Sequence, residues 1–214
     1  MVLAGIFRLA LAVAQATGAG GFVPRDALPI VVLETELGTI ILEIDTRRAP
    51  VTAANFLKLV REGFYDGGEF HRAVRPDNEP RKEAPIQVVQ ARINPARANA
   101  EFPPISIERT STTGLTHRDG TVSMARDVTP TAPGPDTATS WFFITIGDQP
   151  VLDFGGGRSP DGQGFAAFGR VLEGMDVVKR IQASPTPPTT PATSRAGPGQ
   201  TLVPTIKIQK ASVR

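Results

Sequence analysis

Residues 69–74 read EFHRAV, and residues 140–145 read SWFFIT. Both stretches are rich in aromatic and β-branched side chains, which favour β-strands. They place one fixed cation, Arg72, and the adjacent pair Phe142 and Phe143 in two predicted strands that can line the same groove. A cation beside an apolar pocket is poorly suited to hydrolysis.

Outward from these stretches, most of the chain alternates between short strand-like runs and turns rich in Gly and Pro. A hairpin is predicted over residues 30–44, where two β-branched runs flank Gly38. Further strands are expected at residues 86–90, 120–125, 141–146, 165–171 and 205–209. Many short strands with few helices indicate a mainly β, closed antiparallel barrel, which leaves no strand edge unpaired.

Two helices interrupt this pattern. The first is predicted over residues 50–62, because Pro50 suits the first turn, apolar residues recur at helical spacing and Gly63 suits the C-terminal cap. The second is predicted over residues 175–181, where apolar residues share one face. Long irregular segments rich in Pro are expected at residues 75–85 and 184–204.

The composition excludes several kinds of site. The 214 residues include 23 Lys or Arg and 21 Asp or Glu, so the net charge is only +2, and a nucleic-acid-binding domain is not expected. The chain has no Cys, which removes disulfides, thiolate catalysis and thiolate metal sites. It has two His and no D-x-D-x-D-G calcium loop, so neither a metal site nor a cofactor is expected. The length suits one folded domain.

Residues 1–29 are predicted to form a leader and linker before that domain. The first sixteen residues have one cation, an apolar centre and an Ala14-x-Ala16 end, the pattern of a secretory signal peptide. Arg8 splits the apolar run, so a disordered or helical leader is the alternative. A signal peptide implies a periplasmic or secreted protein, and its absence implies a cytoplasmic one. No run of about 20 uninterrupted apolar residues occurs, so no membrane-spanning helix is expected.

Several segments occur in an order and spacing that resemble those of one protein family. They are residues 36–40 (ELGTI), 49–56 (APVTAANF), 63–67 (GFYDG), 70–72 (FHR), 120–125 (GTVSMA), 140–144 (SWFFI) and 165–175 (FAAFGRVLEGM). Over about residues 30–210 the chain resembles a bacterial-like cyclophilin-type peptidyl-prolyl cis/trans isomerase with a divergent pocket. The resemblance implies an eight-stranded cyclophilin-like barrel capped by two α-helices, with a proline pocket on its outer face. It implies an enzyme that accelerates X-Pro isomerisation during protein folding and acts on proline-containing peptides and unfolded or folding proteins. We expect the enzyme to be a monomer.

The resemblance assigns catalysis to Arg72. Amide conjugation gives the peptide bond a rotational barrier of about 18–20 kcal/mol, and X-Pro bonds interconvert slowly. A guanidinium that hydrogen-bonds the proline carbonyl or the imide nitrogen can favour the twisted transition state electrostatically. By the same resemblance, Phe143 matches the floor of the pocket, and Gln90 matches a glutamine that contacts substrate backbone or orients the arginine. The other substrate-binding positions that match are Val88, Ala125, Arg126, Trp141, Leu152 and Phe165.

Three neighbouring aromatic or histidine side chains are given structural roles. Alternation along a strand predicts that His71 points to the opposite face from Arg72, as a packed or hydrogen-bonded core residue. The same alternation predicts that Phe142 points into the barrel while Phe143 faces the pocket. His117 precedes a turn and is expected to be structural.

The chain departs from the family pattern around the pocket. Trp141 stands where most members have Gln, Val151 where many have Trp, and Phe165 where many have His or Tyr. The charged segment at residues 75–85 is an insertion directly after the catalytic motif. A second function therefore stays open: a proline-peptide binding module or chaperone with a cyclophilin fold and little turnover. A third, an unrelated ligand-binding barrel, requires the order of the motifs to be coincidence.

Overall fold

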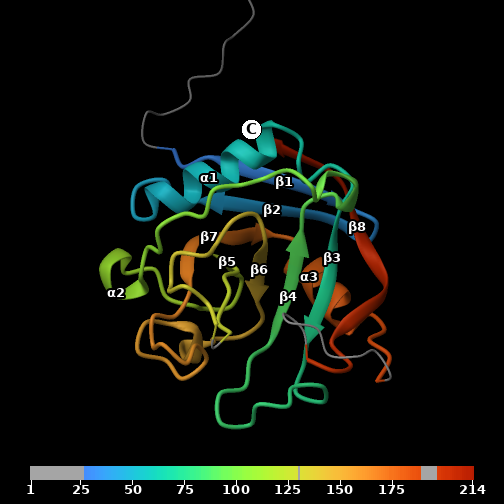
Figure 1. Cartoon of the computed structure of the whole chain (residues 1–214). Coiled ribbons are helices and arrows are strands. Elements are labelled where there is room, and N and C mark those ends of the chain that lie inside the picture. Colours follow the sequence, from blue (N-terminus) through green and yellow to red (C-terminus); the bar gives the residue numbers. More distant parts are fainter. Residues whose placement is uncertain (1–26, 130, 189–196) are drawn as a thin grey trace, which may run out of the picture.

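The computed structural model describes residues 27–129, 131–188 and 197–214. Within these residues, eight antiparallel strands close into one barrel in the order β1-β2-β7-β5-β6-β4-β3-β8 (Figure 1). The strands are β1 Ile30–Thr35, β2 Gly38–Ile44, β3 Gly68–Val74, β4 Val88–Arg92, β5 Thr121–Met124, β6 Phe142–Thr145, β7 Ala166–Glu173 and β8 Thr201–Val213. The predicted mainly β, closed barrel is confirmed. The predicted signal peptide lies outside the described residues.

Helices accompany the barrel strands. The described residues form three α-helices: α1 Pro50–Arg61, α2 Thr110–Thr113 and α3 Met175–Ala183. The two predicted helices correspond to α1 and α3, whereas α2 is a single unpredicted turn that ends at Gly114 in the left-handed conformation. In this part of the chain, no helix is long and apolar enough to cross a membrane.

An aromatic cluster fills the barrel interior. Phe56, on the buried face of α1, lies 5.3 Å from Tyr65, 5.3 Å from Phe142 and 5.1 Å from Phe168, measured between ring centroids. All four rings are fully buried. The prediction that Phe142 points into the barrel is therefore confirmed, and α1 is held by the ring that it inserts among the strands.

Strand β3 contains a bulge that changes which residues share a face. Its pairing shifts between Phe70 and Arg72 against both neighbouring strands. Phe70 and Ala73 both belong to the interior cluster, and they lie three residues apart, so strict alternation is broken between them. The side chain of His71 packs on Trp141 instead of the interior. The prediction that His71 and Arg72 point to opposite faces is therefore wrong, because the bulge places both outside the barrel interior. The prediction of a packed, buried ring is confirmed, because His71 is 8% exposed and lies against Trp141.

Strand β8 is longer than the predicted strand at residues 205–209. It begins at Thr201, inside the segment that was expected to be loop up to Pro204. Its pairing with β3 shifts between Phe70↔Ile206 and Arg72↔Thr201, so Pro204 lies within an irregularity where no ladder hydrogen bond is required of it. This irregularity carries β8 past Arg72. The other predicted excursion, residues 75–85, connects β3 to β4 and projects beyond the strand ends (Figure 1).

Candidate active site

Arg72, Gln90 and Phe143 occupy opposing positions on three neighbouring strands. Arg72 of β3 pairs with Gln90 of β4, and Gln90 pairs with Phe143 of β6. Opposed residues project to the same face of a sheet, and neighbouring strands lie about 4.8 Å apart, so the Arg72 and Phe143 backbones are separated by about 10 Å. A guanidinium and an aromatic ring therefore face one surface of the barrel.

A groove of about 290 Å³ opens over this row of residues. Its apolar base belongs to a cluster distinct from the barrel interior, and the rings of Phe143 and Phe165 meet edge to face with centroids 5.6 Å apart. We call this base the floor; it consists of Ile86, Val88, Phe143, Leu152 and Phe165. The floor presents aromatic and aliphatic surface to the groove, which suits the apolar ring of a proline.

The guanidinium of Arg72 is held between two amide side chains. Its Nε and Nη2 atoms donate to Gln200 Oε1 at 3.0 and 2.8 Å, and its Nη1 atom donates to Gln90 Oε1 at 3.0 Å. A guanidinium has five N–H groups, so two remain without a partner among the described residues. Burial, together with repulsion from Arg158, lowers the pKa of Arg72 to about 10, and attraction to Glu79 opposes this shift. Arg72 therefore remains charged at neutral pH and keeps donors for a ligand.

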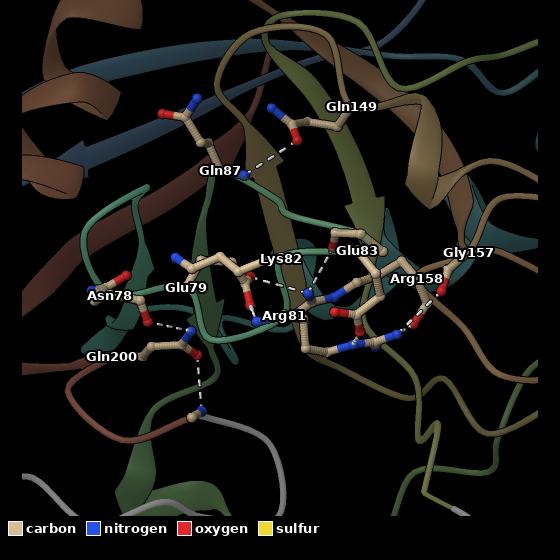
Figure 2. Close-up of polar contacts among 12 residues, drawn as sticks. Asn78, Glu79, Arg81, Lys82, Glu83, Gln87, Gln149, Gly157, Arg158 and Gln200 are labelled. Atoms are coloured by element: carbon tan, nitrogen blue, oxygen red, sulfur yellow. Dashed lines mark hydrogen bonds and ion pairs between the residues drawn. The ribbon is translucent and has the colours of Figure 1, made fainter.

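A polar rim stands beside the floor. We define the rim as Arg81, Arg158 and Gln200, all of which line the groove. Figure 2 shows how Arg81, from the 75–85 excursion, reaches across to the Gly-rich loop: Nη1 donates to the Arg158 carbonyl at 2.7 Å and Nη2 to the Gly157 carbonyl at 3.2 Å. Arg158 in turn forms a 3.0 Å ion pair with buried Glu79 and donates to the Ala84 carbonyl at 3.0 Å. The excursion thus forms one wall of the groove.

A buried hydrogen-bonded chain supports the floor from behind. His117 Nδ1 lies 2.7 Å from Asp153 Oδ1, and Nε2 lies 3.0 Å from Ser123 Oγ. The His117 ring stacks on Phe143 with an interplanar angle of 13°. The order Ser–His–Asp is that of a hydrolytic triad, but Ser123 has 0% exposure, so its hydroxyl cannot reach a ligand. The structural role expected of His117 agrees with this packing beneath the floor.

Arg126 is tied down instead of reaching into solvent. Its Nε donates to the Gly164 carbonyl at 2.8 Å, its Nη2 donates to Asp161 at 2.7 Å, and the guanidinium lies 5.4 Å from the centre of the Phe165 ring. The Ala125 N–H donates to the Trp141 carbonyl at 2.9 Å. Arg126 therefore holds the edge of the groove in shape, and its side chain is already engaged before any ligand binds.

His71, the neighbour of Arg72 in β3, packs on Trp141 with ring centroids 4.7 Å apart. Neither ring nitrogen has a hydrogen-bond partner among the described residues. Burial, together with the positive charges of Arg92 and Arg72, lowers the pKa of His71 to about 3, and Glu69 opposes this shift. The ring is therefore neutral at physiological pH and does not serve as a proton donor beside Arg72 there.

All nine predicted site residues line this one groove; they are Arg72, Val88, Gln90, Ala125, Arg126, Trp141, Phe143, Leu152 and Phe165. Sequence reasoning missed the rim. Gln200 lay in a segment assigned to flexible loop, and Arg158 lay in a Gly-rich stretch without a motif. In the described ranges, no group of three or more His, Cys, Asp or Glu side chains is placed to hold a metal ion.

Comparisons with known proteins agree with this geometry. Residues 30–213 match the family described as cyclophilin type peptidyl-prolyl cis-trans isomerase/CLD. The chain is 33% identical over 157 residues to a peptidyl-prolyl cis-trans isomerase of Acinetobacter baylyi, covering 73% of each chain. It is 33% identical over 154 residues to peptidyl-prolyl cis-trans isomerase B of Escherichia coli, covering 72% of this chain and 84% of that one. The chain belongs to the cyclophilin-type isomerase family.

Solved cyclophilins share the fold of this one. A Cryptosporidium parvum cyclophilin type peptidyl-prolyl cis-trans isomerase, crystallised in the presence of the dipeptide Ala-Pro, aligns with a TM-score of 0.62 at 19% sequence identity, covering 86% of this chain and 98% of that one. At that identity the likeness concerns the fold alone. It does not extend to the side chains of the groove, such as the rim and Trp141.

Proposed function

We propose that this cyclophilin catalyses X-Pro isomerisation with Arg72 as the electrostatic catalyst and the floor as the seat of the proline ring. The observation that carries the proposal is a charged Arg72, with two N–H groups still available, held across from Phe143 over an apolar groove. The family makes the chain a peptidyl-prolyl cis-trans isomerase.

The geometry suits a reaction that breaks no covalent bond. Rotation about the X-Pro bond requires the imide nitrogen to lose conjugation with its carbonyl. A fixed cation beside the nitrogen or the proline carbonyl stabilises the charge distribution of the twisted state more than that of either planar isomer. The floor keeps the proline ring still while the preceding carbonyl turns. Arg72 supplies the cation, and Gln90 keeps it on the groove side of β3.

Substitution of Arg72 tests the catalytic assignment. In a protease-coupled assay on an Ala-Pro-Phe peptide, Arg72→Ala is expected to lower kcat/KM by about one to three orders of magnitude, because it removes an electrostatic donor. Arg180→Ala, which removes an exposed arginine of α3, is the matched control and should retain activity. Retention of full activity by Arg72→Ala would exclude this mechanism.

A proline-peptide binding module with little turnover is the second candidate function. Trp141 and Phe165 favour it, because both add apolar lining to the groove where the family more often has polar side chains. The two functions separate in a single sample: NMR exchange spectroscopy of an Ala-Pro peptide reports cis/trans interconversion, and titration calorimetry reports binding. Binding without accelerated exchange would identify a module, and accelerated exchange identifies the isomerase.

The proposed substrates are proline-containing segments of folding proteins. The proposed binding species is the monomer. The groove is open and lined by floor and rim from one chain, so it needs no second copy to be complete. Sedimentation analysis tests the monomer, and acceleration of a proline-limited refolding reaction tests action on whole proteins.

A periplasmic or secreted location is proposed from the leader. Its single cation, apolar centre and Ala14-x-Ala16 end support export. Mass spectrometry of the mature protein decides the question: a start near Thr17 identifies cleavage of a signal peptide, and an intact Met1 supports a cytoplasmic protein.

A further inference from the structure

Gln200 stands directly before β8, beside the catalytic arginine. Thr201, the next residue, pairs with Arg72 across the β3–β8 ladder, and the Ala73 N–H donates to the Gln200 carbonyl at 3.0 Å. The Gln200 side chain is 1% exposed. A long polar side chain is almost never buried so completely unless its amide is used.

The Gln200 amide is used at both ends. Its Oε1 atom accepts from Arg72 Nε at 3.0 Å, from Arg72 Nη2 at 2.8 Å and from the Gly197 N–H at 2.8 Å. Its Nε2 atom donates to the Asn78 carbonyl at 3.2 Å (Figure 2). Rotation of the amide by half a turn would set Nε2 against three donors and Oε1 against a carbonyl oxygen. The orientation is therefore fixed by its partners.

The inserted 75–85 segment fastens this arrangement through Asn78. The Asn78 Nδ2 atom donates to the Ala73 carbonyl at 3.1 Å and to the Gly199 carbonyl at 3.0 Å. One side chain thus ties the end of β3 to the turn that precedes β8. The backbone carbonyl of Asn78 accepts the hydrogen bond that Gln200 Nε2 donates. The insertion therefore supports Arg72 indirectly: Asn78 holds Gln200, and Gln200 holds the guanidinium.

The partners of Arg72 are neutral. Both side chains that receive its hydrogen bonds are amides, and among the described residues no carboxylate lies within ion-pair distance of it. An aspartate or glutamate at position 200 would hold a guanidinium more strongly, since charge-assisted hydrogen bonds are the stronger kind. It would also offset the positive charge of Arg72 that stabilises the transition state of the substrate. An amide orients the guanidinium and leaves its charge intact.

We propose that Gln200 is a positioning residue for the isomerase reaction: its neutral oxygen, locked by Asn78 and Gly197, aims Arg72 without cancelling its charge. This inference rests on the proposed function of Arg72. The competing explanation is that Gln200 only fills space and satisfies backbone groups at the start of β8.

Two substitutions at position 200 separate these explanations. Gln200→Leu removes the acceptor, and Gln200→Glu keeps the length and the acceptor while adding a negative charge. An ordinary Glu pKa is about 4.3; burial at position 200 raises it, while the Arg72 cation and the hydrogen bonds donated to Oε1 lower it, so the new carboxylate is ionised at pH 7.5. Gln209→Glu makes the same chemical change at an exposed position of β8, the strand that follows Gln200, and is the matched control. The measurements are kcat and KM by NMR line-shape analysis, the melting temperature, and the NMR signal of the Arg72 Nε–H group.

If Gln200 positions Arg72, Gln200→Leu lowers kcat by about tenfold with little change in KM, because an interaction used in the transition state is lost. The Arg72 Nε–H signal broadens or exchanges faster in this variant. Gln200→Glu is expected to retain the sharp Nε–H signal, yet also to lose about tenfold in kcat. Its second oxygen faces the Asn78 carbonyl in place of the Nε2 donor, so its melting temperature should fall. Gln209→Glu should match wild type in every measurement.

Wild-type kcat in either Gln200→Glu or Gln200→Leu overturns the proposal. In the first case the charge of Arg72 does not need to be left free, and in the second the arginine needs no support. If Gln200→Leu fails to fold, Gln200→Glu alone decides. Failure of the proposed function is a different result: the wild-type protein would show no isomerase activity, while the Nε–H signal would still report whether Gln200 holds Arg72.

Discussion

The floor and the rim of the groove lie side by side and are held by different forces. The floor consists of buried apolar side chains packed on one another, with Phe143 stacked on His117 behind it. The rim consists of side chains from loops, joined by hydrogen bonds to carbonyls and by the Arg158–Glu79 ion pair. Packing resists deformation but carries no charge, whereas the rim carries charge and depends on each partner being present.

This difference divides the work of the site. The floor can give affinity for a proline ring through apolar contact, which is tolerant of the exact neighbour. The rim fixes the direction of a guanidinium, which depends on hydrogen-bond geometry of a few tenths of an ångström. Damage to the floor should therefore appear mainly as lost stability and weaker binding. Damage to the rim should appear in catalysis and in coupling between partners.

The largest stability effect is expected from the floor itself. Phe143→Ala removes a ring that is 5% exposed, so it should lower the free energy of unfolding by about 3 kcal/mol, at the lower end for such truncations because the space opens onto the groove. KM for proline peptides should rise as well. Urea unfolding measures the first effect and the isomerase assay the second. Phe154→Ala, at a ring that is 45% exposed, is the control, and an equal loss there would show that burial in the floor is not the cause.

The rim should respond to removal of one member of its ion pair. Arg158→Leu leaves Glu79 buried without its counter-charge, which should cost about 3 kcal/mol of unfolding free energy, the lower end for a broken buried pair because the Arg158 side chain is 11% exposed. The double variant Glu79→Gln/Arg158→Leu should recover much of this loss, because no unpaired charge remains. Denaturant unfolding of both singles and the double measures the coupling.

An exposed ion pair provides the control for that cycle. Arg170→Leu breaks the Arg170–Glu43 pair, in which the Arg170 side chain is 65% exposed, and should cost less than about 1 kcal/mol. If the two arginine substitutions cost the same, or if the double variant is as unstable as the sum of its singles, the rim is not held by a coupled buried pair.

The same division explains how much of the site could be predicted from sequence. Alternation along one strand predicted that Phe143 faces away from Phe142, and the places of Phe143 and Val88 in the pocket followed from the resemblance to the family. The 30–44 hairpin and α1 carry equally local signals in turn glycines, Pro50 and apolar spacing. For this reason the boundaries of the hairpin and of α1 could be predicted to within one residue.

The rim depends on contacts between segments that are distant in the sequence. Gln200 contacts Arg72 only because β8 runs alongside β3 there. The start of β8 could not be predicted from a local pattern, because Pro204 interrupts the strand-like sequence. Arg158 is placed by Glu79 and Ala84, which lie in a proline-rich insertion. The bulge at His71 likewise reflects unequal lengths of β3 and β8 between paired positions. No periodicity within β3 announces it.

His71 combines the two kinds of force, because its ring is held by packing on Trp141 and can also take up a proton. Its pKa in the folded protein is lowered to about 3, while in the unfolded chain it is near the ordinary value of about 6.5. Between these values the unfolded chain binds a proton that the folded protein does not. Stability should therefore fall as the pH drops below about 6.5, by at most about 1.4 kcal/mol per pH unit from this group.

The test compares wild type with His71→Phe, which keeps a ring against Trp141 and cannot titrate. Urea unfolding at a series of pH values from 7.5 to 4.5 gives the difference between the two proteins, in which contributions from the carboxylates largely cancel. The variant should gain on wild type steadily as the pH falls below 6.5. A constant difference across the range would mean that His71 accepts its proton without leaving Trp141, and that this side of the groove is as adaptable as an exposed surface.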